Sequence, residues 1–135
     1  MLGEILFEER GRTSGVRVIS SDANETTLEV SLQTEGRILG VEQRSMWTYL
    51  SRTRSDGSIY GEGKGIMTTK DGDVIRMEGV GAAPGMSGDG SIRYRCGLHF
   101  QTNSQKFSKL NGVLGVAEYN VAADGTTVAT VWEWK

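Results

Sequence analysis

The sequence predicts an all-β protein, an antiparallel up-and-down (meander) β-barrel of about eight strands. Three observations lead to this prediction. Nineteen glycines stand against a single proline. Long segments rich in Val, Ile, Thr and aromatic residues, which favour strands, alternate with turn signals. The strongest of these signals are the Asp-Gly pairs Asp56-Gly57, Asp71-Gly72, Asp89-Gly90 and Asp124-Gly125. Long antiparallel strands joined by tight turns are typical of a meander barrel rather than a sandwich.

The first four expected strands are separated by polar or glycine-containing turns. The strand over Thr26–Thr34 is the clearest, because Leu28, Val30 and Leu32 alternate with polar residues. The first strand has a possible break at Gly11–Gly15, where two glycines interrupt the apolar pattern. The expected ranges are Glu4–Ile19, Thr26–Thr34, Gly40–Arg54 and Ser58–Lys70.

The last four expected strands follow the same logic. Pro84 falls in the loop Ala82–Gly88, where it removes no hydrogen bond from the sheet. Ser104–Leu110 is expected to form a loop or one turn of helix. One strand face carries an apolar series of Ile92, Tyr94, Cys96, Leu98 and Phe100. The expected ranges are Asp73–Ala82, Ser91–Asn103, Val113–Ala123 and Thr126–Trp134.

Length and composition limit the class of protein. The 135 residues fit a single β-barrel domain over residues 1–135. A net charge of −2 argues against a nucleic-acid partner. One cysteine and one histidine exclude a disulfide framework and indicate no metal site, and no motif indicates a cofactor. Without a long apolar run or a basic leader, we expect a cytoplasmic protein with no membrane partner.

The turns also predict which residues share a face. If each Asp-Gly pair forms a two-residue turn, the last hairpin pairs Tyr119 with Thr130 and Ala117 with Trp132. The face that holds Tyr119 and Trp132 is apolar, so we expect it to point into the barrel.

The same assumption aligns the three strands between Gly40 and Ala82, and neither face of them is clearly polar. We favour the face with Trp47 and Tyr49 inside, which brings Glu62 and Lys64 inward with it. The alternative places the charged pair Arg76 and Glu78 inside. A sheet that is apolar on both sides predicts contact with a second copy, so we expect a homo-oligomer.

Two sequence motifs do not indicate the catalytic or phosphate-binding sites that they resemble. The run Gly61-Glu62-Gly63-Lys64-Gly65 lacks the helix that a phosphate-binding loop requires, and it indicates room for neighbouring rings or for a ligand. Cys96 and His99 stand three positions apart on one strand, so they face opposite sides and form no catalytic dyad.

The aromatic residues of the predicted interior suggest either a filled core or a ligand cavity. Our first hypothesis is a barrel that binds an apolar small molecule carrying one or two oxygens. The alternatives are a cyclase- or isomerase-type enzyme that confines its substrate, and an oligomeric interaction module without a pocket. No catalytic residue is assigned. The candidate ligand-binding residues are Trp47, Tyr49, Glu62, Lys64, Met77, Tyr94, Tyr119 and Trp132.

The later part of the chain resembles the allene oxide cyclase-like (calycin-like) β-barrels, which include small bacterial proteins of unknown function. The resemblance rests on the Gly-x-Gly-x-Gly strand, on Phe100-x-Thr102-x-Ser104 and on Leu110-Asn111-Gly112-Val113-x-Gly115-Val116, followed by an aromatic strand. It covers residues 40–135. It implies an oligomeric eight-stranded barrel with an apolar central cavity, and no catalytic residue is transferred by it.

Overall fold

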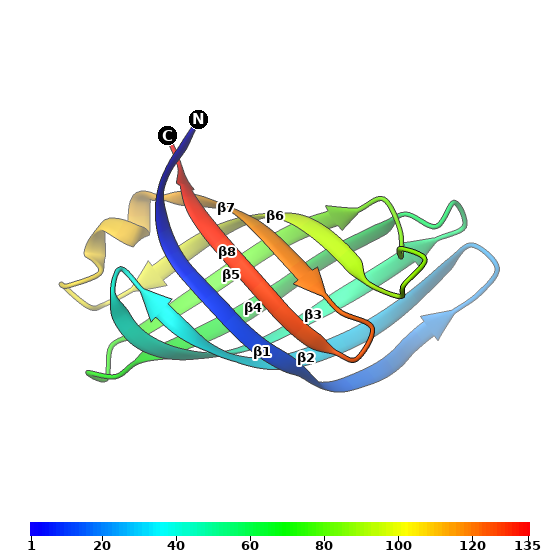
Figure 1. Ribbon diagram of the computed structural model, residues 1–135, viewed down its shortest axis with the longest axis horizontal. Helices are drawn as coiled ribbons and strands as arrows, with labels where there is room; N and C mark the ends of the chain where they lie inside the picture. Colours follow the sequence, from blue (N-terminus) through cyan, green and yellow to red (C-terminus); the bar gives the residue numbers. More distant parts are fainter.

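A computed structural model describes all residues, 1–135, and confirms the predicted fold class: eight antiparallel strands close into a barrel in sequence order (Figure 1). One short 3-10 helix, η1 (Ser108–Gly112), interrupts the meander, and no helix is long and apolar enough to cross a membrane. The strands are β1 (Leu2–Ser21), β2 (Glu25–Ile38), β3 (Val41–Arg54), β4 (Ile59–Thr69), β5 (Val74–Ala83), β6 (Ile92–Thr102), β7 (Leu114–Val121) and β8 (Thr126–Trp134).

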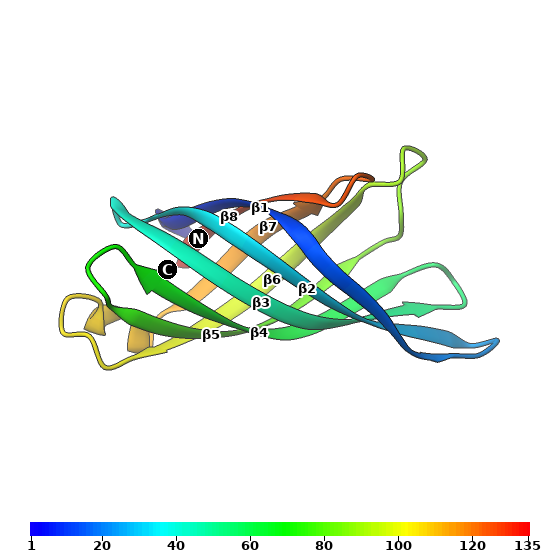
Figure 2. The same ribbon diagram turned by 90° about the horizontal axis from the view of Figure 1, so that it is seen from below.

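The first strand is one continuous element with two roles. From Leu2 to Arg12 it pairs with β8 and closes the barrel, and the possible break at Gly11–Gly15 is only a register shift between Thr13 and Gly15. Beyond Thr13 it pairs with β2 alone. The β1–β2 hairpin therefore projects from the barrel body (Figure 2).

The four Asp-Gly turns are not two-residue turns. In each, the glycine has φ between +84° and +91°, and its amide donates to the carbonyl of the residue three positions earlier, as Gly57 does to Arg54. This is a three-residue loop, a type I turn followed by a glycine bulge. A two-residue loop occurs instead at Leu39-Gly40, where both residues have positive φ.

A loop longer by one residue shifts the register by one position and reverses the face of the following strand. Trp47 of β3 therefore lies opposite Gly65 of β4, and the glycines face the interior. The prediction that Glu62 and Lys64 point inward is wrong, because both side chains lie on the outer face. The same shift at Asp124-Gly125 directs Val131 inward, so the prediction that Trp132 faces the interior is also wrong.

The outer face of β3–β5 carries charged side chains together with exposed apolar ones such as Met46, Ile66 and Val80. Lys64 lies opposite Glu78, and Glu78 lies opposite His99, with nitrogen–oxygen distances of 3.9 and 3.4 Å. Arg76 is exposed on the same side, so the alternative that buries Arg76 and Glu78 is wrong as well. The expected contact of this face with a second copy stays a prediction.

Two apolar clusters divide the interior. The larger lies at the end that η1 covers, where Phe107 and Leu110 are almost fully buried. It contains Leu6, Phe7, Ile38, Met67, Ile75, Met77, Leu98, Phe100, Phe107, Leu110, Ala117 and Val131. The smaller cluster contains Ile59, Ala83 and Tyr94, with Tyr49 and Tyr119 packed against it. The interior between the clusters is not filled.

Candidate functional site

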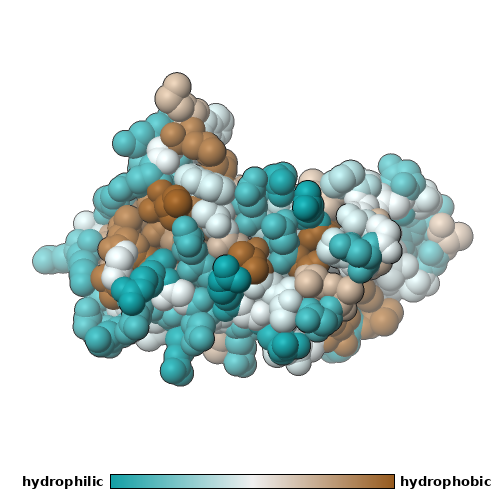
Figure 3. Space-filling view, viewed as in Figure 1, coloured by the Kyte–Doolittle hydropathy of each residue, from teal (hydrophilic) through white to brown (hydrophobic).

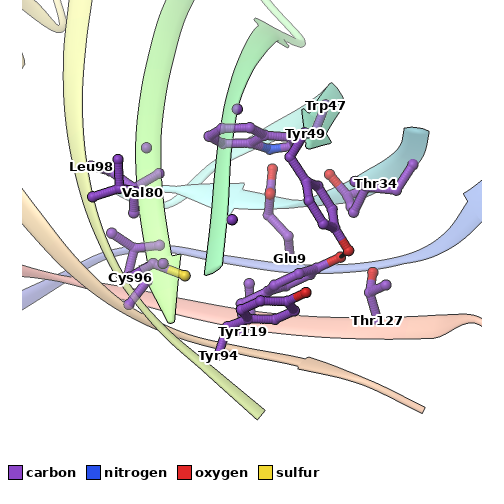
Figure 4. Close-up of a pocket in the computed structure, with 18 of the residues that line it drawn as sticks. Glu9, Thr34, Trp47, Tyr49, Val80, Tyr94, Cys96, Leu98, Tyr119 and Thr127 are labelled. Atoms are coloured by element: carbon purple, nitrogen blue, oxygen red, sulfur yellow. Dashed lines mark hydrogen bonds between the residues drawn. The ribbon is translucent and has the colours of Figure 1, made fainter. Parts of the chain in front are cut away.

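The barrel encloses a cavity of about 90 Å³ between the two clusters (Figure 4). Sites for drug-sized ligands measure roughly 300–1,000 Å³, so this cavity suits a small molecule of few atoms. Its walls are mainly hydrophobic and come from all eight strands, and η1 contributes none. Trp47, Tyr49, Tyr94 and Tyr119, all candidates from the sequence, line it together.

Glycines make the wall that β4 and β5 contribute. A Cβ atom at Gly65 would lie 2.5 Å from the Trp47 ring, and one at Gly63 would lie 2.5 Å from the Tyr49 Cβ. The Gly-x-Gly-x-Gly strand thus gives space to the rings of β3, as its sequence predicts. Gly61 differs, because a Cβ atom there would meet nothing closer than 3.6 Å.

Three tyrosines form a cluster next to these glycines. The rings of Tyr94 and Tyr119 stack with centroids 5.6 Å apart, and Tyr49 meets both rings edge-on. The Tyr49 and Tyr119 hydroxyl oxygens are 3.3 Å apart, and the Tyr94 hydroxyl lies 3.2 Å from that of Ser51. Burial raises the pKa of all three phenols, so they remain neutral hydrogen-bonding groups.

Glu9 is the acidic side chain that lies inside the barrel, and it is only 4% exposed. The Gln43 side-chain amide donates to its Oε2 atom over 2.9 Å, and the Ser45 hydroxyl contacts the same oxygen. Burial raises the pKa of the Glu9 carboxyl group, and these hydrogen bonds oppose the rise only in part. No lysine, arginine or histidine lines the cavity to balance a negative charge.

The strand register explains how Glu9 reaches its partners. Glu9 of β1 lies opposite Gly36 of β2, and Gly36 lies opposite Gln43 of β3. Because Gly36 has no side chain, the Glu9 carboxyl group can cross β2 and contact β3. Thr34, the next inward residue on β2, lies near this group, and its buried hydroxyl has no hydrogen-bond partner.

Sequence reasoning found the aromatic side of this site and missed its polar side. Glu62 only borders the cavity, because its carboxylate binds Arg52 on the outer face over 2.7 Å. Lys64 is 83% exposed. Met77 is buried in the larger cluster rather than at the cavity wall.

Glu9, Thr34 and Cys96 were not among the candidates, although all three line the cavity. A signal for Glu9 was present: it stands two positions after Phe7, so the two side chains share one strand face.

The sequence matches no protein-family model and no curated protein. Solved structures show the same fold. A conserved protein of unknown function from Rhodopseudomonas palustris has a TM-score of 0.80 at 18% identity, covering 99% of both chains. A beta-barrel-like protein from Acinetobacter baumannii has a TM-score of 0.83 at 16% identity, covering 100% of this chain and 96% of its own. An enzyme from Penicillium herquei has a TM-score of 0.71 at 18% identity, covering 96% and 92%. At these identities the likeness establishes the barrel fold alone.

Proposed function

We propose that this protein binds a small, mostly apolar molecule inside its barrel. The observation that carries the proposal is the aromatic and glycine-lined cavity of about 90 Å³, which the chain leaves unfilled although the other end of the barrel is densely packed. Close packing is the norm in protein interiors, and an unfilled apolar space loses contact energy. A ligand of matching size would restore those contacts.

Native mass spectrometry of freshly purified protein tests this proposal directly. We expect a retained small molecule, or binding of an added aromatic compound such as benzene detected by ligand-observed NMR. Gly61→Val should abolish binding, because its side chain enters the cavity, where a Cβ atom has only ordinary contacts. Gly97→Val is the matched control, since a Cβ atom at Gly97 meets nothing within 4 Å. Equal binding by both variants would contradict the cavity as the site.

Cys96 offers a second measurement in the unmodified protein. Burial raises the pKa of its thiol to about 11, so little reactive thiolate is present at neutral pH and alkylation should be slow. Because Cys96 lines the cavity, a bound ligand should slow the reaction further. Unchanged alkylation at saturating ligand would place the ligand elsewhere.

A cyclase- or isomerase-type activity is the second candidate, and the buried Glu9 favours it. A carboxyl group in an apolar cavity is suited to proton transfer, because burial raises its pKa above its ordinary value. Turnover that is lost in Glu9→Gln, with folding and ligand binding intact, would support an enzyme. Binding without turnover of any unsaturated substrate would favour a carrier or sensor.

Self-association through the outer face of β3–β5 remains a prediction. On the face seen in Figure 3, hydrophobic side chains form separate patches among hydrophilic ones. On the face of β3–β5, Met46 and Ile66 are exposed beside the charged pair Lys64 and Glu78. Analytical ultracentrifugation tests the prediction, and a monomer at micromolar concentration would contradict it.

A further inference from the structure

The polar side chains around Glu9 form a closed network that determines where the protons lie. Glu9 Oε2 contacts the Gln43 Nε2 atom at 2.9 Å and the Ser45 hydroxyl oxygen. The same hydroxyl lies 2.9 Å from Gln43 Oε1. A serine hydroxyl carries one hydrogen, so it cannot donate to both acceptors. One of the three contacts therefore requires a proton on Glu9.

Rotating the Gln43 amide does not change this result. The amide oxygen would then face Glu9 Oε2, and two acceptor oxygens again need a hydrogen between them. All three contacts are satisfied only when Glu9 is a neutral acid with its hydrogen on Oε2. The surroundings agree. Glu62 borders the cavity but binds Arg52 on the outer face, and the other titratable groups at the cavity are Tyr49, Tyr94, Tyr119 and Cys96, each kept protonated by burial.

One buried polar atom beside the network, the Thr34 hydroxyl oxygen, has no hydrogen-bond partner. It is nevertheless close enough to the Glu9 carboxyl group to influence its pKa. Gln43 and Ser45 both contact Oε2, so with the proton there Glu9 Oε1 is a carbonyl-type oxygen that these two residues leave free. The Trp47 indole also lies near enough to the carboxyl group to lower its pKa. A buried polar group without a partner is costly in a protein interior, so the Thr34 hydroxyl needs an explanation.

We propose that Glu9 and Thr34 bind the hydroxyl group of a small uncharged alcohol or phenol. The Thr34 hydroxyl donates to the ligand oxygen, and the ligand hydroxyl donates to Glu9 Oε1. This inference rests on the proposed function and names the polar anchor of the same cavity. One hydroxyl satisfies both protein groups, whereas a hydrocarbon leaves both unpaired and a carboxylate introduces a charge with no cation to meet it.

A set of four ring compounds tests the inference: phenol, benzene, benzoate and benzylammonium. In the unmodified protein, phenol should bind about tenfold more tightly than benzene, as expected for two buried hydrogen bonds after desolvation. Benzoate should bind more weakly than benzene. Thr34→Val removes the hydroxyl with little change of shape, and it should reduce the preference for phenol to near unity while benzene affinity stays the same.

Variants at Glu9 separate a neutral acid from a carboxylate. Glu9→Gln keeps a carbonyl oxygen and an uncharged side chain, so it should retain most of the preference for phenol. Glu9→Leu should lose that preference. Infrared spectroscopy adds an independent readout, because the unmodified protein should show the C=O band of a buried neutral carboxylic acid, and Glu9→Gln should lack it.

The outcomes distinguish this inference from the proposed function. If benzene and phenol both fail to bind, the proposed function is wrong. If both bind with equal affinity, the cavity binds ligands and the polar anchor is wrong. Tighter binding of benzylammonium than of phenol would mean that Glu9 is ionised, which would also overturn the inference. Should Glu9→Leu fail to fold, Thr34→Val still decides the question.

Discussion

The end of the barrel that η1 covers is filled by large apolar side chains, whereas the part around Tyr49 is lined by glycines and phenol rings and keeps a cavity. The two regions lie in one continuous sheet. At the filled end, Phe7 and Phe100 pack edge-on with centroids 6.2 Å apart. Near the cavity, polar groups such as Glu9 and Thr34 face an apolar space. The filled end is suited to stabilise the fold. The region around Tyr49 is less densely packed and leaves room for a ligand.

Truncation at the filled end should have the largest effect. Leu110 of η1 is fully buried, so Leu110→Ala should lower the free energy of unfolding by about 2–5 kcal/mol, measured by urea denaturation. Lys109→Ala is the control from the same turn. Its ion pair with Glu4, 2.7 Å long, is exposed and screened by solvent, so its loss should change stability far less. Equal losses would show that η1 does not close the core.

Two glycines of β4 should respond in opposite ways to the same substitution. At Gly63 an added Cβ atom would lie 2.7 Å from the Thr48 carbonyl oxygen, so Gly63→Ala should cost about 1–3 kcal/mol. Gly61→Ala should be neutral or stabilise by up to about 1 kcal/mol, because its Cβ atom fits and the unfolded chain loses freedom. Similar losses for both would mean that Gly61 does not border free space.

The buried acid should make stability depend on pH. Burial raises the pKa of folded Glu9 above its ordinary value of 4.5, so the folded chain binds more protons than the unfolded one. Its contribution is therefore fully present below pH 4.5 and is lost as the pH rises through the folded pKa.

Relative to Glu9→Gln, the unmodified protein should lose up to about 1.4 kcal/mol per pH unit across that window. Parallel stability curves for the two proteins, measured by denaturation at a series of pH values, would contradict this expectation.

The smallest effect is expected at a phenol hydroxyl. Tyr119→Phe removes the 3.3 Å contact with Tyr49 but keeps the ring stacked on Tyr94. It should change the free energy of unfolding by less than about 1 kcal/mol. A loss above about 2 kcal/mol would show that the hydroxyl pair belongs to the structural core rather than to the cavity wall.

The strands were predictable because apolar alternation and Asp-Gly pairs are local signals. The faces of β4 and β8 were not, because a loop of two and a loop of three residues share the Asp-Gly pair. A finer signal distinguishes them here. In Asp56-Gly57-Ser58, the aspartate accepts hydrogen bonds from both the amide and the hydroxyl of Ser58, and Asp89 and Asp124 do the same with the residue after their glycine.

The polar half of the site depends on contacts between strands, which local patterns do not contain. Glu9 and Gln43 are 34 positions apart, and only the shared register through Gly36 brings them together. The end of β2 shows the same limit. The strand was expected to end at Thr34 but continues through Gly36 to Ile38. Glycine is needed at position 36 because β1 passes close to it: a Cβ atom there would lie 1.8 Å from the Glu8 carbonyl oxygen. Such a contact between strands cannot be read from the local pattern.

The projecting β1–β2 hairpin leaves an unpaired strand edge, since β1 has no partner other than β2 beyond Thr13. Val16, Val18 and Ile19 are all exposed along this edge. Such edges can recruit strands from other molecules and begin aggregation. Arg17 stands between the two valines and pairs with Glu29 at 3.3 Å, and register shifts flank it on both sides. A charge and irregular geometry are the features by which natural sheets discourage that growth, so this short segment opposes pairing of the open edge with another strand.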